Sequence, residues 1–228
     1  GLGDVYKRQG RAAYLKSKDL KWETAKTTDI GIELGFFNND LTLSLDYFVK
    51  KNVDLLAQID LNLSSGQIFE INSSREKPYV NTASVKNTGW EFMMNYRKQL
   101  TKDFHIDATF NIATLKNKVL SLGENVQPIT SGAMSSYFND AASITMPGEA
   151  IGSFYGYKID GFDAEGNFIF ADTDKNGVVN ANDKVILGSP IPDFTYGLNI
   201  NMEYKDFDLT VFFQGVQGND IFNQKKYT

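Results

Sequence analysis

The sequence predicts an all-β fold and, more specifically, a segment of an antiparallel transmembrane β-barrel. Three observations predict it. Apolar and polar residues alternate strictly over stretches of about nine or ten residues, aromatic residues stand at the ends of the apolar face, and short connections alternate with long ones. The alternation occurs in six segments, which predicts about six spanning strands that cannot close into a barrel on their own.

The alternating segments form three hairpins in chain order. Successive side chains of a strand point to opposite faces, so the apolar residues of each hairpin share one face and the polar residues share the other. We expect the apolar face to point outward, toward lipid. The predicted strands and turns are 29–36 and 41–49 with a turn at 37–40, 90–96 and 104–112 with a turn at 98–103, and 196–204 and 207–214 with a turn at 205–206.

A soluble sandwich with one wet face would show the same alternation, so strand length and end chemistry decide between the two folds. Soluble strands usually run about five or six residues, whereas about nine to eleven are needed to cross a bilayer at a tilt. The two long connections, 50–87 and 115–194, are predicted to be extracellular loops. The aromatic residues at the ends of the apolar face are Phe36, Tyr47, Trp90, Tyr96, Phe104, Tyr196, Tyr204 and Phe207.

Composition excludes several classes of protein. The net charge is -5 and the 23 Lys and Arg residues are scattered, so nucleic acid is not an expected partner. Without cysteine there is no disulfide framework and no thiolate nucleophile. No apolar run approaches the roughly 18 residues of a membrane helix, so strands must make any spanning structure.

The beginning of the chain carries no secretory signal, which is either absent or cut from this sequence. Residues 1–9 read as a non-native scar at the end of a sequenced fragment, and 10–228 as a partial barrel. We expect the missing part of the protein to hold the remaining strands.

Several blocks of sequence stand in a fixed order from about residue 20 to the end. They are Lys21-Trp22-Glu23, residues 27–31, Phe36-Phe37-Asn38-Asn39, residues 85–92, 148–157 and 186–197, and residues 212–221. Together these blocks resemble the barrel of SusC/RagA-type TonB-dependent importers.

This resemblance implies a closed barrel with an N-terminal plug in the outer membrane of a Gram-negative bacterium of the Bacteroidetes type. It implies a SusD-like surface lipoprotein as partner, TonB as the source of energy through a missing N-terminal region, and contact with membrane lipid. Oligosaccharides or peptides are the implied substrates, and the protein is not expected to be an enzyme.

Two other classes remain open. A soluble or surface glycan-binding β-protein with a dockerin-like calcium loop would have a closed, soluble fold. An adhesin or assembly barrel would have no plug upstream. The sequence does not name the substrate, because specificity arises from parts of the protein largely outside these residues.

The segment from Asp172 to Asp183 has the spacing of a calcium-binding loop. Short oxygen-bearing side chains at such offsets converge on one hard cation, with glycine at the sharp turn. Position 12 is aspartate, as in dockerin modules, and no flanking helices are expected. A structural, external Ca²⁺ is one interpretation, and an ion-free polar turn is the other. Asp172, Asp174, Asn176, Gly177, Val178 (through its carbonyl), Asn180 and Asp183 fall at positions 1, 3, 5, 6, 7, 9 and 12.

Phe154, Tyr155 and Tyr157 lie in the second long connection, where aromatic rings could stack on sugars. The alternative is that they pack the loop against the barrel wall, and the sequence favours this alternative. They are the only weak candidates for substrate binding that the sequence offers.

No arrangement of residues points to catalysis. His105, the single histidine, shares the polar face with Asp107 and has no recognisable Ser or Cys partner, so a hydrogen-bonding role in the lumen is expected. Glu33 and Asp46 are ordinary charged residues of that face. Gly215 and Gly218 read as loop glycines, because no strand followed by a helix gives a phosphate-binding context.

Overall fold

The computed structural model describes residues 20–58, 79–123, 126–133 and 141–223. The nine residues interpreted as a scar, and residues 59–78 of the first predicted loop, lie outside this part. The main sheet contains β1 (Thr24–Phe36), β2 (Leu41–Gln58), β3 (Tyr79–Thr101), β4 (Phe104–Thr114), β5 (Lys116–Ser121), β12 (Phe194–Tyr204) and β13 (Phe207–Gln217). The other elements are β6 (Ile129–Ala133), β7 (Ala141–Thr145), β8 (Ser153–Tyr157), β9 (Ile159–Phe162), β10 (Phe168–Phe170), the 3-10 helix η2 (Ala181–Asp183) and β11 (Lys184–Gly188).

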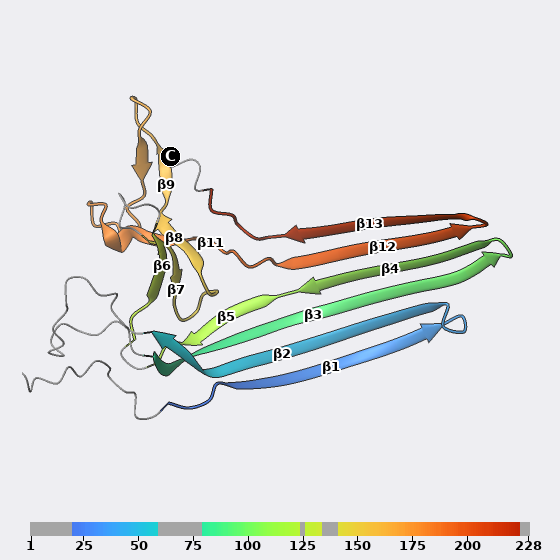
Figure 1. Ribbon diagram of the computed structural model, residues 1–228. Helices are drawn as coiled ribbons and strands as arrows, with labels where there is room; N and C mark the ends of the chain where they lie inside the picture. The colour runs from blue at the N-terminus through green and yellow to red at the C-terminus, as the bar shows by residue number, and fades with distance from the viewer. Residues whose placement is uncertain (1–19, 59–78, 124–125, 134–140, 224–228) are drawn as a thin grey trace, which may run out of the picture.

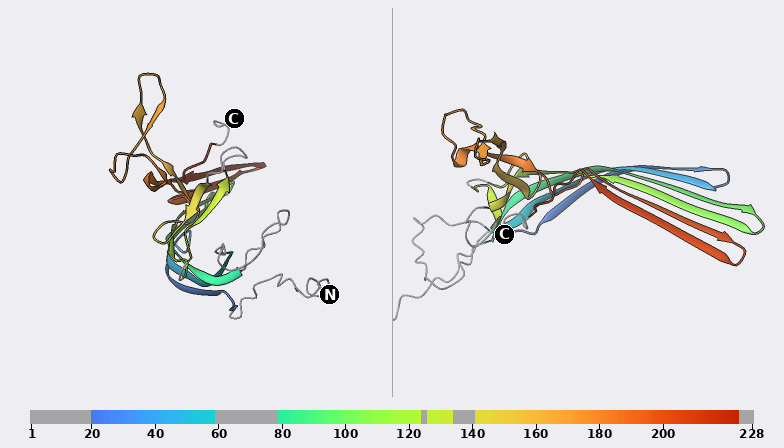
Figure 2. Two further views of the ribbon diagram at one scale, coloured as in Figure 1. Left: turned by 90° about the vertical axis from the view of Figure 1, so that its left-hand side faces the viewer. Right: turned by 90° about the horizontal axis from the view of Figure 1, so that it is seen from above.

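The six predicted spanning strands form one antiparallel sheet in the order β1-β2-β3-β4-β12-β13. The pairing of β4 with β12 places the second and third hairpins side by side, although residues 115–193 separate them in sequence. Figure 1 shows these strands running together in a single layer. Seen end-on, the sheet forms an open arc with β1 and β13 at its two edges (Figure 2). The fold is therefore an unclosed antiparallel barrel wall, as predicted.

The hairpin turns agree with the prediction at 37–40 and 205–206 but not at 98–103. The strand β3 continues to Thr101, so the second turn contains only Lys102 and Asp103. Lys98 pairs with Ile106, and a register shift between Gln99 and Thr101 absorbs the extra residue. The prediction of a longer turn was wrong because polar residues near a strand end look like a loop when the pairing partner is unknown.

The register assembles one continuous apolar band on the outer face. Directly opposed residues on neighbouring strands share a face, and the six spanning strands each contribute one residue to the same row. Among the described residues no second sheet covers this band, and its side chains at the sheet edges stay exposed, with Ile30 at 69% and Phe207 at 78%. The central row is Leu34, Leu43, Met94, Phe110, Leu198 and Phe213.

At the end opposite the short turns, the chain builds additional structure. β2 and β3 continue past the predicted strands into residues 50–58 and 79–87, and β5 continues the line of β4 along β3. A separate sheet in the order β11-β8-β7-β6 and the β9–β10 hairpin stand at this end (Figure 1). A small core of Ala83, Val85, Val119 and Leu122 fills the inner face between β3 and β5.

No helix in the described part of the chain is long and apolar enough to span a membrane.

Candidate functional site

The polar face of the sheet carries a network of hydrogen bonds. Arg97 forms an ion pair with Asp107 at 2.8 Å, and the Asn95 side-chain amide donates to Thr109 Oγ1 at 2.8 Å. These residues come from β3 and β4, and their registers place all of them opposite the apolar band. The face therefore suits a water-filled lumen.

Glu33 and Asp46 lie on this polar face, on β1 and β2. Asp46 accepts a hydrogen bond from Ser44 Oγ at 2.7 Å and lies opposite Gly31, where any larger side chain would collide with its carboxylate. Glu33 lies opposite Ser44 rather than Asp46. The two carboxylates occupy different positions along the hairpin.

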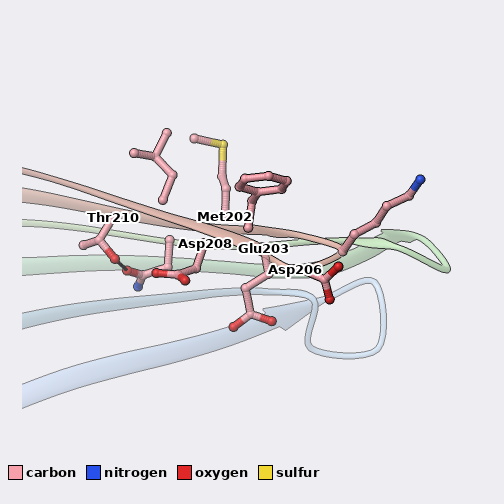
Figure 3. A pocket seen from close by; sticks show the side chains of 9 residues that line it. Met202, Glu203, Asp206, Asp208 and Thr210 are labelled. Atoms are coloured by element: carbon pink, nitrogen blue, oxygen red, sulfur yellow. Dashed lines mark hydrogen bonds between the residues drawn. The ribbon is translucent and has the colours of Figure 1, made fainter.

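His105 lies near the short turns, opposite Gln99 on β3 and Glu203 on β12. A shallow hollow at the neighbouring β12–β13 turn contains Glu203, and Figure 3 shows Met202 pointing to the opposite side of the sheet. In the same hollow, Thr210 Oγ1 donates to Asn201 Oδ1 at 2.9 Å. The surroundings of His105 are those of a lumen residue near the turn end.

The predicted calcium loop connects β10 to β11 and brings three carboxylates together. Asp172, Asp174 and Asp183 each offer an oxygen, and these oxygens lie within 4.8 Å of one another. Two oxygens on opposite sides of a calcium ion, each about 2.3–2.6 Å away, stand about 5 Å apart. The separation is therefore compatible with one shared cation.

Asp183 also holds the loop in shape. It is fully buried, and its carboxylate accepts the backbone N–H groups of Thr173 at 2.7 Å and Asn180 at 2.8 Å. The hydrogen bond from the Asn180 backbone, with those from Asp174 and Thr173, holds the pKa of Asp183 below its ordinary value of 3.8. Position 12 of the loop is thus a structural anchor as well as a predicted ligand.

The other predicted ligands take part in turns of the same loop. Asn176 Oδ1 accepts the Val178 backbone N–H at 2.8 Å, and the Val178 carbonyl accepts from the Asn180 side-chain amide at 3.1 Å. Asp172 accepts the backbone N–H groups of Asn176 at 3.1 Å and Gly177 at 2.7 Å. Gly177 has φ +86°, the left-handed conformation that the sharp turn requires.

The three aromatic candidates lie on β8, in the smaller sheet. The Phe154 and Phe222 rings are 6.3 Å apart, and the Tyr157 and Phe170 rings are 5.6 Å apart. Tyr155 pairs with Ile186 on β11. These contacts suit the packing interpretation, and sugar stacking by these residues stays a prediction.

An exposed aromatic hairpin was not predicted from the sequence. β9 and β10 enclose the turn 163–167, where Asp163 accepts backbone hydrogen bonds from Glu165 and Asn167. Phe162 and Phe168 face each other across it at 5.4 Å and are 65% and 56% exposed. The Asp-Ala-Glu-Gly-Asn stretch between two phenylalanines was the available signal.

Comparisons with known proteins agree with this architecture. The family model described as TonB dependent receptor-like, beta-barrel matches residues 1–227. TonB-dependent receptor P3 of Formosa agariphila is 36% identical over 221 residues, which are 90% of this chain and 21% of that protein. The TonB-dependent receptor SusC of Bacteroides thetaiotaomicron is 29% identical over 235 residues, or 97% of this chain and 22% of SusC.

The same architecture occurs in solved structures. The RagAB peptide importer in its 'open-open' state matches with a TM-score of 0.70 and 22% identity, over 88% of this chain and 21% of the matched chain. At this identity the likeness shows the fold alone. The chain spans about a fifth of the length of the relatives that it matches.

Proposed function

Because the chain belongs to the TonB-dependent receptor β-barrel family, we propose that it forms part of the wall of an outer-membrane importer. Members of this family are outer-membrane receptors involved in nutrient import. The observation that supports the proposal most is the register, which places a continuous apolar band on one face of the spanning strands and a polar network on the other. A soluble sandwich would cover that band with a second sheet.

The imported nutrient is an oligosaccharide or a peptide, taken up with a SusD-like surface lipoprotein and driven by TonB through a region outside this chain. The similarity to SusC and the fold shared with the RagAB peptide importer support this choice. The barrel wall passes its substrate on unchanged, which the similarity to TonB-dependent receptors supports. The host is a Gram-negative bacterium of the Bacteroidetes type.

Deletion of the gene for the full-length receptor should abolish growth on one substrate class at limiting concentration. Oligosaccharides and peptides are supplied in parallel as sole carbon or nitrogen source, and the restored gene is the control. A tagged receptor should also co-purify with a lipoprotein from detergent extracts. Unchanged growth on every substrate, together with no associated lipoprotein, would contradict the importer proposal.

We also propose that the loop from Asp172 to Asp183 binds one structural calcium ion on the external side. The 12-residue spacing and the convergence of three carboxylates support it. Asp183 contributes a carboxylate that stays ionised, because its pKa is lowered. The ion would tie β10 to β11 without taking part in transport chemistry.

Replacing Asp172 by alanine in the full-length receptor should remove calcium binding, since position 1 supplies an oxygen to the shared site. Binding in the unmodified receptor is expected at about 10⁻⁴–10⁻³ M, as in extracellular modules, and isothermal titration with calcium measures it. Asp160→Ala, at an exposed carboxylate before the loop, is the control. Binding should also be lost when Asp183 becomes protonated, which its lowered pKa places at a pH below the ordinary value of 3.8. If Asp172→Ala binds calcium as tightly as the unmodified receptor does, the loop is only a polar turn and the calcium proposal is wrong.

A further inference from the structure

A row of lysines crosses the outer face of the sheet beyond the apolar band. Lys26 on β1 lies directly opposite Lys51 on β2, Lys51 opposite Lys86 on β3, and Lys86 opposite Lys118 on β5. Four neighbouring strands thus each contribute one lysine at the same level. Lys116 stands two residues from Lys118 on the same face.

The row belongs to the lipid-facing side of the sheet. Lys26 is four residues from Ile30 in β1, and Lys86 is four residues from Trp90 in β3. The period of two in a strand therefore gives them the same orientation as the apolar band. The register through these positions is continuous in both pairings, so no bulge reverses the face.

The level of the row corresponds to the boundary of the membrane. Lys26 stands ten residues before Phe36, which ends the apolar band at the short turn. At about 3.3 Å per residue and a tilt of about 40°, ten residues rise about 25 Å, the height of the apolar band of an outer-membrane barrel. Tyr47 and Trp90, whose rings are 4.7 Å apart, mark the aromatic end of the band just below the row.

Four ammonium groups on adjacent strands repel one another. Like charges directly opposite in a sheet destabilise the pairing, and in the described part of the chain none of these lysines forms an ion pair with a carboxylate. The row therefore favours an anionic partner from outside these residues. Its partner must carry several negative charges in one plane at the membrane surface.

We propose that this lysine row, defined as Lys26, Lys51, Lys86 and Lys118, binds the phosphate groups of lipid A in the outer leaflet. The inference rests on the proposed outer-membrane location. The long connections stand at the end of the strands where the row lies, and in outer-membrane barrels that end is extracellular. The outer leaflet there consists of phosphorylated glucosamine lipids, whose phosphates can each accept hydrogen bonds from lysines of this row, which stand on neighbouring strands about 5 Å apart.

The experiment uses the full-length receptor, purified in detergent and stripped of bound lipid. Native mass spectrometry then measures the binding of bis-phosphorylated lipid A. The variant carries the four substitutions Lys26→Gln, Lys51→Gln, Lys86→Gln and Lys118→Gln, and its affinity should fall at least about tenfold. Heat-dependent migration in electrophoresis checks that the barrel is folded.

The matched control removes the same charge elsewhere, through Lys50→Gln, Lys102→Gln, Lys158→Gln and Lys175→Gln, all at exposed lysines outside the row. Lys50 neighbours Lys51 on β2 but points to the polar face. The control variant should bind lipid A as the unmodified receptor does. The unmodified receptor should bind dephosphorylated lipid A and phosphatidylglycerol at least about tenfold more weakly, and its lipid A affinity should fall with added salt.

Equal binding of lipid A by the row variant and the control variant would overturn the proposal, as would equal binding of dephosphorylated lipid A or phosphatidylglycerol by the unmodified receptor. If the row variant does not fold, these lipid comparisons and the salt dependence of the unmodified receptor decide. The result is separate from the importer proposal, which fails only if the deletion strain grows normally on all substrates and no lipoprotein is bound.

Discussion

Replacement of Leu198 by arginine should destabilise the full-length barrel by about 2–4 kcal/mol, the cost of a cationic side chain near the middle of the bilayer. Leu198 stands near the middle of β12, paired with Phe110 on one side and Phe213 on the other. Its side chain belongs to the central row of the apolar band, so the guanidinium would have to enter lipid there. Urea unfolding of the receptor in lipid vesicles, followed by electrophoretic migration, measures the change in the free energy of unfolding.

The neighbouring residue provides the matched control. Asn199 lies on the same strand and points to the polar face, opposite Thr109 and Phe212. Arginine at this position would face the lumen, where water is available, and should change stability by much less. Similar losses for Leu198→Arg and Asn199→Arg would mean that the two faces do not differ in environment, and the assignment of the outer face would be wrong.

The strands and hairpins could be predicted because their signal is local. In β12, for example, Leu198 and Ile200 alternate with Asn199 and Asn201 along one stretch, and Lys205-Asp206 marks the turn to β13. The same holds for β1 and β2. A period of two identifies a strand and its two faces without knowledge of its neighbours.

The pairing of distant strands could not be predicted in this way. β4 and β12 pair although residues 115–193 lie between them in the sequence, and the residues of neither strand indicate which strand is its partner. The continuation of β3 to Thr101 depends on its pairing with β4, with a register shift after Gln99. Both features follow from contacts between segments rather than from composition.

The lysine row also depends on contacts between segments that are distant in the sequence. Lys26, Lys51, Lys86 and Lys118 are scattered along the chain and form no cluster in sequence. Only the register of three strand pairs brings them to one level and one face. Charged residues that are far apart in the sequence can therefore be neighbours in a sheet.

The calcium loop could be predicted from the sequence only in part. Its residue types and spacing are local, so the convergence of Asp172, Asp174 and Asp183 could be anticipated. The burial of Asp183 could not, because it depends on backbone N–H groups of Thr173 and Asn180 folding around the carboxylate. The spacing in the sequence indicates which oxygen atoms can come close together. The structure adds which of these oxygens also accept the hydrogen bonds that keep the loop in shape.

We propose that the spanning strands cross a membrane with their short turns inside and the smaller sheet outside. Single cysteines test it, since residues 1–228 contain none; any cysteine elsewhere in the full-length receptor is first removed. Ala164, in the exposed β9–β10 turn, and Asp206, in the exposed β12–β13 turn, stand at opposite ends of the strands (Figure 1). A large, membrane-impermeant maleimide reagent is then added to intact cells.

We expect Ala164→Cys to react in intact cells and Asp206→Cys to react only after the outer membrane is permeabilised. Labelling of both sites after permeabilisation shows that each cysteine is reactive. Reaction of Asp206→Cys in intact cells to the same extent as Ala164→Cys would contradict the claim that these strands span the membrane.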